Sequence, residues 1–475
     1  MTAHKTFESV APPGSSDTEG HPRAGQMVAL MALCAGTLQA MAAAMNLAVP
    51  SLARSSLHPG PTALVWIVDA YLITFACLLI PGGALAGRFG RKGVLLTGFG
   101  LFAGGLALAA GAGNVPMLIA ARAVAGAGAA LALPVTLGLL MLLVAPARRP
   151  HAVATWTAAL AVGGILGNVV GGPVLEYLPW QGLFVVFGAA GALLFGAIGW
   201  LVPRTPRRPA PLDLPGSVLS AAVIVAVLYG LIEGRELGWG SAPVLGSFAA
   251  AVAIGIVAVL VGLRRPHPLL DPRVFAVPRL RAGTLGVTAA FAGAFAMFYV
   301  NSQYLTTAHG FSLAVAGFAI APIAVVMTFA SRSTPALVRR WGPRRVVAGG
   351  FALQVAGLAL FSLVGARTPY ALYIWCPALA MAGIGFALPP LSGGIMAALP
   401  PERAGMGSGL NGAAREIGSA VGVAAMGTAL GTRAVGGGAS ASALAASMDG
   451  GFRVMAVAVA VTAALAVRWT AAESG

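Results

Sequence analysis

Long apolar segments, separated by short polar or basic stretches, run along almost the whole chain of 475 residues. Each is about 20 residues long, the length that a helix needs to cross the ~30 Å hydrocarbon layer of a bilayer. Strands of a membrane barrel would instead alternate apolar and polar positions over ~10 residues. The pattern predicts an all-α membrane protein with fourteen spans, at residues 27–50, 62–82, 94–112, 115–141, 152–175, 182–202, 214–233, 243–263, 283–305, 312–331, 346–364, 369–399, 405–431 and 451–469.

The composition supports an integral membrane protein and gives little support to an enzyme. The chain is 58% hydrophobic and 9% charged, with a mean hydropathy of +0.88, so a soluble fold would expose too much apolar surface. The six His and three Cys show no metal-ligand spacing, and neither a serine elbow nor a P-loop is present. We therefore predict no enzyme activity, no metal and no cofactor, and an ion gradient as the source of energy.

The net charge of +16 raises the question of a nucleic-acid partner, and the distribution of the charge argues against one. If the N-terminus is cytoplasmic, 22 of the 29 Lys and Arg residues fall in tails or cytoplasmic loops, five fall outside and two lie within spans. Such an excess orients membrane proteins. The sequence thus predicts cytoplasmic termini, a lipid bilayer as partner and no nucleic acid.

An internal repeat divides the chain into two halves. ALAGRFGRKGVLL (Ala84–Leu96) aligns with ALVRRWGPRRVVA (Ala336–Ala348), and each lies at a turn between two spans. Matching loops imply parallel bundles with a substrate site between them near the bilayer midplane. The predicted order is a disordered cytoplasmic tail, a six-helix bundle, a linker with two extra transmembrane helices, a second six-helix bundle and a short cytoplasmic tail, at residues 1–26, 27–202, 203–282, 283–469 and 470–475.

Four segments carry recognisable motifs. They are GALAGRFGRK from Gly83, RAVAGAGAAL from Arg122, GGILGNVVGG from Gly163, and PPERAGMGSGLNGAAREIGSAVGVA from Pro400. Together they resemble the major facilitator superfamily, and specifically its fourteen-span branch of drug:proton antiporters, over nearly the whole chain after residue 26. The resemblance implies the major facilitator fold and transport by alternating access.

Two of these motifs imply residues that control conformational change. In the first, Gly83 and Gly90 would permit a tight turn while Arg88 and Arg91 latch helix ends, although Gly87 replaces the family's usual Asp. In the fifth span, small residues at helical spacing let two helices approach closely and form a deformable pivot, although Asn168 occupies the motif's Pro position. These gating glycines are Gly163, Gly167, Gly171 and Gly172.

The first span departs from the family pattern at a position that matters for coupling. QAMAAAMNLAVP matches the motif at Asn46 and Pro50, but Met41 stands where the family has an acid. In the family that carboxylate is thought to exchange a proton for a cationic drug. Coupling must therefore use another group or be absent.

Asp69 is the leading candidate for that group. Counting residues from the outer ends of their spans places Asp69 and Arg122 each ~10 Å deep, so we expect them to face each other or to share water. Protonation of Asp69 would weaken this attraction and bias the transporter toward one conformation. A structural polar bridge is the alternative. Arg415 and Glu416 lie ~15 Å deep near mid-bilayer, and Glu416 is a further coupling candidate with the same alternative.

The expected cavity is formed by polar and apolar residues of several spans: Met41, Asn46, Tyr71, Gln303, Tyr304 and Arg415. Tyr at a helix end can instead be an interfacial anchor. Because the first-span acid is missing, an anionic or neutral metabolite suits Arg122 and Arg415 better than a cation does.

The sequence as a whole predicts a monomeric exporter of a drug, antibiotic or secondary metabolite in a bacterial plasma membrane, driven by protons. An importer or facilitator is the first alternative, and the export-type glycine helix disfavours it. A transport-inactive membrane sensor is the second, and the short tails without a soluble domain disfavour it.

Overall fold

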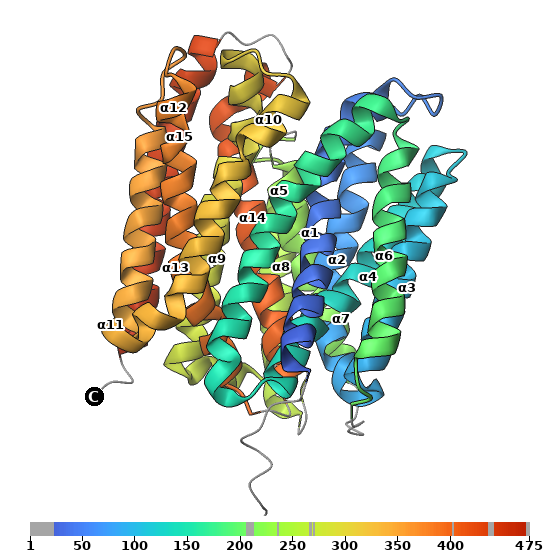
Figure 1. Ribbon diagram of the computed structural model, residues 1–475, viewed down its shortest axis with the longest axis vertical. Helices are drawn as coiled ribbons and strands as arrows, with labels where there is room; N and C mark the ends of the chain where they lie inside the picture. Colours follow the sequence, from blue (N-terminus) through green and yellow to red (C-terminus); the bar gives the residue numbers. More distant parts are fainter. Residues whose placement is uncertain are drawn as a thin grey trace, which may run out of the picture.

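The computed structural model describes residues 23–205, 213–234, 237–265, 268, 271–400, 403–435 and 441–471. Within these ranges all regular elements are helical, which confirms the all-α prediction. The helices run along the long axis of the molecule (Figure 1). They are α1 (Ala24–Ala53), α2 (Pro61–Phe89), α3 (Arg91–Ala110), α4 (Val115–Leu143), η1 (Pro146–Arg148), α5 (Arg149–Tyr177), α6 (Gln181–Leu201), α7 (Leu214–Glu233), α8 (Ala242–Arg264), η2 (Pro272–Ala276), α9 (Pro278–Ala308), α10 (Leu313–Ala319), α11 (Ala321–Phe361), α12 (Tyr370–Tyr373), α13 (Trp375–Ala397), α14 (Ala404–Val435) and α15 (Ala441–Ala471).

Twelve helical segments in the described part of the chain are long and apolar enough to cross a membrane. One of them, Val315–Phe361, has 47 residues, far more than the ~20 that one crossing needs. It bends at Gly342, whose φ of 78° and ψ of 158° are not helical, so it makes two crossings. With the 32-residue α14 packed among the others, the helices accommodate fourteen crossings. The count of fourteen stays a prediction.

The helices form two bundles that repeat one packing scheme. In the first, α1 packs against α5, α2 against α4, and α3 against α4 and α6. In the second, α9 packs against α14, and α11 packs against α13 and α15. Figure 1 shows α1 to α6, in blue to green, on one side and α9 to α13 with α15, in yellow to red, on the other. The internal repeat read from the sequence therefore corresponds to a structural repeat.

The backbone at the two repeated turns shows why both need glycine. Gly90 joins α2 to α3 with φ 89° and ψ 132°, and Gly342 divides α11 with φ 78° and ψ 158°. A side chain would clash in this left-handed region, and glycine has none. Both turns lie at the same end of the molecule, the lower end in Figure 1. We call it the basic end, because Arg88 and Arg91 flank the first turn in the sequence and Arg340 precedes the second.

The additional helices α7 and α8 lie outside the two bundles. Helix α7 packs against α2 of the first bundle and α14 of the second, through a small apolar cluster of Ala76, Ile80, Ile224, Leu228 and Ala413. Helix α8 packs against α7 and η2 and leaves most of its apolar side chains exposed, as a helix facing lipid does. The pair is thus a hairpin docked along the seam between the bundles.

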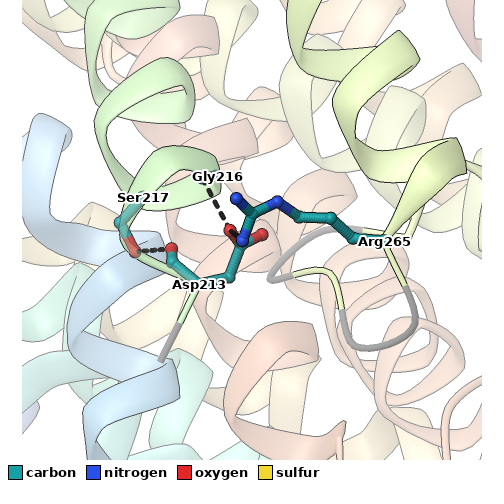
Figure 2. Close-up of polar contacts among 4 residues, drawn as sticks. All are labelled: Asp213, Gly216, Ser217 and Arg265. Atoms are coloured by element: carbon teal, nitrogen blue, oxygen red, sulfur yellow. Dashed lines mark hydrogen bonds and ion pairs between the residues drawn. The ribbon is translucent and has the colours of Figure 1, made fainter. Parts of the chain in front are cut away.

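A buried carboxylate closes this hairpin at the start of α7. Asp213 accepts a hydrogen bond from the Gly216 amide at 3.0 Å, which caps the helix, and an ion pair from Arg265 Nη1 at 3.1 Å. The Asp213 carbonyl accepts from the Ser217 hydroxyl at 2.8 Å. Figure 2 shows how Arg265, just after α8, reaches back to this cap. One side chain thereby ties both ends of the hairpin together.

Asp213→Ala is expected to lower the free energy of unfolding by about 1–2 kcal/mol, because it removes a helix cap and a charge-assisted hydrogen bond together. Asp213→Asn keeps an oxygen for the cap, so we expect a smaller loss. Thermal unfolding of the purified protein in detergent measures both. Equal stability of Asp213→Ala and the parent protein would contradict this role.

Several helix ends differ from the sequence prediction. The second span was predicted to end at residue 82, and α2 continues to Phe89. The tenth was predicted to end at residue 331, and α11 remains helical up to Gly342. Another difference is at the start of the last span. We predicted it to begin at residue 451, and α15 begins at Ala441. The added segment ASALAASMDG is rich in alanine, a strong helix former, and Asp449 pairs with Arg453 one turn later at 2.7 Å. Of the tails predicted at 1–26 and 470–475, residues 1–22 and 472–475 lie outside the described residues, whereas α1 begins at Ala24 and α15 ends at Ala471, inside the predicted tails.

Candidate functional site

A narrow crevice, with no room for a water molecule in this conformation, lies where α14 of the second bundle meets α2, α4 and α5 of the first. The first bundle contributes mostly apolar side chains and one indole, and α14 contributes polar ones. The lining residues are Leu79, Leu133, Pro134, Leu137, Trp156, Ser408, Asn411, Gly412 and Arg415. Because both bundles form its wall, any relative movement of the bundles changes its shape.

Arg415 is the charged group of the crevice. Its side chain is 1% exposed, and its Nη2 donates to Gln39 Oε1 of α1 at 3.1 Å, across the boundary between the bundles. Its guanidinium lies 4.7 Å from the ring of Phe291 and 5.8 Å from that of Trp156, so two aromatic faces stabilise the cation. Its Nε and Nη1 have no hydrogen-bond partner within the described residues.

Asn411 lies one helical turn before Arg415 and shares its face of α14. It is 1% exposed, and its Oδ1 accepts a hydrogen bond from the Ser392 hydroxyl at 2.9 Å. Its Nδ2 finds no partner in the part of the chain that the structure describes. Helix α14 therefore presents unused donors to the crevice at two successive turns.

The second buried cation, Arg122, lies inside the first bundle rather than in the crevice. It is 1% exposed, its Nε donates to the Ile67 carbonyl at 3.1 Å, and its guanidinium lies 4.5 Å from the Tyr71 ring. The Tyr71 hydroxyl in turn donates to the Leu38 carbonyl at 3.3 Å. The half-buried Asp69 is close enough for its charge to attract that of Arg122. The expected proximity of Asp69 and Arg122 agrees with this geometry, and their role in coupling stays a prediction.

Glu416 is half-buried and follows Arg415 in α14, but it does not line the crevice. Its charge interacts with Arg415 and with the Tyr71 hydroxyl of the first bundle. As the next residue along the helix, it points in another direction than Arg415 does.

The glycines of α5 lie at a close helix contact, as their spacing predicts. A methyl group built on Gly163 or Gly167 would overlap the carbonyl oxygens of Gly36 and Ala40 in α1, and one on Gly171 would lie 3.2 Å from Ala44 Cβ. Gly172 is also buried. In the second bundle, Gly418 and Gly422 of α14 meet the backbone of α9 in the same way. The function of this contact as a pivot stays a prediction.

The basic turn connects three helix ends of the first bundle. Arg91 Nη1 donates to the Gly138 carbonyl of α4 at 2.8 Å, and its amide donates to Thr205 Oγ1 at 2.8 Å. Lys92 Nζ donates to the Gly199 carbonyl of α6 at 2.7 Å. Cations near helix C-termini are favourable because those carbonyls carry negative partial charge. Arg88 is exposed over the Phe89 ring, and Gly83 is buried.

Of the six predicted cavity residues, Arg415 alone is among the described residues that line the crevice. Met41 is buried in the core of the first bundle, and Tyr71 packs under Arg122. Tyr304 stacks on Tyr373 at 4.6 Å inside the second bundle, and Gln303 Nε2 donates to the Tyr299 carbonyl at 3.2 Å. Asn46 lies in α1, and its side chain is outside the described part.

Sequence reasoning missed Gln39, Trp156, Ser392 and Asn411. The available signal was the position of Asn411 four residues before Arg415 on one helical face. Gln39, Trp156 and Ser392 come from other helices, and no local pattern connects them with Arg415.

A sequence profile described as the Major Facilitator Superfamily matches residues 28–423. The chain belongs to the major facilitator superfamily. Its relatives include the methylenomycin A resistance protein of Streptomyces coelicolor, 32% identical over 383 residues, covering 79% of this chain and 80% of the relative. The cephamycin export protein CmcT of Amycolatopsis lactamdurans is 32% identical over 399 residues, covering 82% and 81%. The multidrug efflux pump LfrA of Mycolicibacterium smegmatis is 29% identical over 419 residues, covering 87% and 82%.

Solved structures agree with the superfamily fold. The human organic anion transporter MFSD10 (TETRAN) superposes with a TM-score of 0.63, covering 92% of this chain and 100% of that one, at 17% identity. So low an identity supports the fold alone. The predicted family, fold class and absence of an enzyme are confirmed: the chain is a multi-pass membrane transporter, and its relatives are typical of the drug:proton antiporter branch.

Proposed function

We propose that this transporter exports a small organic molecule of the antibiotic or secondary-metabolite class in exchange for protons, by alternating access of its two bundles. The observation that carries the proposal is the crevice, whose wall comes from both bundles and which contains one buried cation, Arg415. The names of the relatives, which are resistance and export proteins, support the substrate class and the direction.

The two bundles make close backbone contacts at two levels. Toward the basic end, a Cβ on Gly409 of α14 would lie 2.9 Å from Ile80 Cα of α2. Toward the opposite end, a Cβ on Gly317 of α10 would lie 3.4 Å from the Asn168 carbonyl oxygen of α5. The first contact lies beside the crevice, between the lining residues Ser408 and Asn411, and the second lies beyond it, so access from the end opposite the basic end requires the second contact to separate.

The proposed coupling site is Asp69 with its neighbour Arg122, and Glu416 is the second candidate. A carboxylate and a guanidinium attract strongly away from water, and a proton on the carboxylate removes most of that attraction. Proton binding would then change the relative stability of two conformations by the difference in attraction. Met41 at the family's usual acidic position cannot supply this step.

Asp69→Asn is expected to reduce proton-driven export by at least about tenfold, because the amide cannot exchange a proton and a 1.4 kcal/mol change already gives that factor. Everted membrane vesicles with an imposed pH gradient and a fluorescent dye measure it. Glu233→Gln, at the end of α7, is the matched control and is expected to retain export. Gradient-driven export by Asp69→Asn at the parental rate would overturn the assignment of Asp69.

We further propose that the basic end faces the cytoplasm of a bacterium, with both termini on that side of the plasma membrane, and that the protein acts as a monomer. The excess of Lys and Arg in the loops at that end supports the orientation. A fluorescent protein fused to the C-terminus is bright only in the cytoplasm, whereas alkaline phosphatase is active only outside, so the two fusions distinguish the orientations.

A further inference from the structure

Three hydrogen-bond donor atoms in the crevice have no partner among the described residues: Nε and Nη1 of Arg415 and Nδ2 of Asn411. Both side chains line the crevice and are 1% exposed. Buried donors are almost always satisfied in folded proteins, since an unpaired one loses its hydrogen bonds to water without replacement. A guanidinium also keeps its charge, so burial does not remove the need for an acceptor.

The neighbours of these donors hold them in place without using them. Gln39 Oε1 accepts from Arg415 Nη2, and the Ser392 hydroxyl donates to Asn411 Oδ1. Asn411 Oδ1 already accepts one hydrogen bond, and the NH₂ group is the part of this amide with no partner among the described residues. The rings of Phe291 and Trp156 interact with the guanidinium as a cation, and such ring contacts do not consume N–H groups.

No carboxylate is among the residues that line the crevice around the donors, although that of Glu416, the next residue of α14, attracts Arg415 from outside the lining. None of the nine described lining residues is Asp or Glu, and the wall opposite α14 is formed by Leu79, Leu133, Pro134, Leu137 and Trp156. A ligand that fits this wall has an anionic group at one end and an apolar or planar group at the other. A guanidinium edge with an adjacent amide matches the paired oxygens of a carboxylate.

We propose that Arg415 and Asn411 form the anchor for the carboxylate of an organic-acid substrate whose apolar part packs against Trp156 and the leucines of the first bundle. This rests on the proposed function and names the substrate class of the same site. The other buried cation has a different role. Arg122 is enclosed within the first bundle and does not line the crevice.

Equilibrium binding to the full-length protein tests the anchor without any gradient. The probe is radiolabelled 2-naphthoate, a planar aromatic carboxylate, and 2-naphthamide is its uncharged counterpart. We expect saturable binding of naphthoate and binding of naphthamide weaker by at least about tenfold, a factor that corresponds to ~1.4 kcal/mol. Equal binding of the two, or no saturable binding of naphthoate, would overturn the proposal.

Two variants locate the site. Arg415→Gln is expected to weaken naphthoate binding by at least about tenfold, and Asn411→Leu, which keeps the guanidinium, by severalfold. Arg332→Gln changes an exposed arginine of α11 and is expected to bind as the parent does. If Arg415→Gln does not fold, the naphthoate affinity of Asn411→Leu alone tests the location of the site. Parental affinity in the folded variants would overturn the assignment.

The binding test of the anchor and the export test of the proposed function can fail independently of each other. Naphthoate binding does not require coupling, so we expect Asp69→Asn to retain it. Binding without proton-driven export in the parent protein would refute the proposed function and leave the anchor standing. Proton-driven export of a neutral or cationic dye without naphthoate binding would refute the anchor and leave the proposed function standing.

Discussion

Gly167→Leu is expected to leave little folded transporter in the membrane. A single methyl group at Gly167 would already overlap the Ala40 carbonyl oxygen, so α1 and α5 cannot keep their distance once any side chain is added. Overpacking of this kind costs about 1–3 kcal/mol where side chains can shift, and here the obstacle is backbone. Yield of detergent-extracted monodisperse protein and its thermal unfolding measure the loss.

The smaller change Gly167→Ala tests the same contact with a matched control. Gly164 is on the same helix, and a Cβ there would meet only Gln39 Cγ at 4.0 Å. Gly164→Ala is therefore expected to fold as well as the parent, helped by the helix propensity of alanine. If Gly167→Ala and Gly164→Ala unfold at the same temperature, the close approach of α1 and α5 does not support the fold as described.

Arg122→Leu is expected to abolish proton-driven export. The guanidinium is close enough to Asp69 for the two charges to attract, and it also packs on Tyr71 and binds the Ile67 carbonyl. The substitution removes this attraction and the hydrogen bond to the Ile67 carbonyl, and losing such a charged hydrogen bond costs about 1–3 kcal/mol. Everted vesicles with an imposed pH gradient measure the export, and thermal unfolding measures the stability.

A surface arginine provides the control for Arg122. Arg453 is 65% exposed at its side chain and pairs with Asp449 one turn away, an interaction of the kind that contributes less than ~1 kcal/mol. Arg453→Leu is expected to export at the parental rate. Arg122→Lys retains the positive charge, but its ammonium lacks the planar array of N–H donors of a guanidinium, so we expect partial export. Parental export by Arg122→Leu would exclude the charge from coupling.

Most of the fold could be predicted because its signals are local. An apolar run of sufficient length forms a helix in a bilayer whatever surrounds it, since its backbone groups have no other partners there. The seventh span was predicted at 214–233, and α7 has these bounds. The start of α15 was missed because the alanine-rich segment before residue 451 has helix propensity without strong hydrophobicity.

The candidate functional residues could be predicted only in part. The sequence predicted that Asp69 and Arg122 lie at the same depth in the membrane, because the number of residues from the end of a membrane helix gives the depth directly. It could not say that Met41 and Tyr304 would be packed in the bundle cores, because depth does not determine the direction in which a side chain points.

The sequence by itself determined that this chain is a membrane transporter of the major facilitator superfamily, with two repeated helical halves and two buried arginines. In sequence, Arg122 and Arg415 look similar, because each is a cation within a predicted span rich in small residues. Only the tertiary structure decided that Arg122 is enclosed with Asp69 and Tyr71, whereas Arg415 faces a crevice between the bundles with donors to spare. The physical reason is that enclosure depends on which helices pack around a side chain, and those helices come from distant parts of the chain.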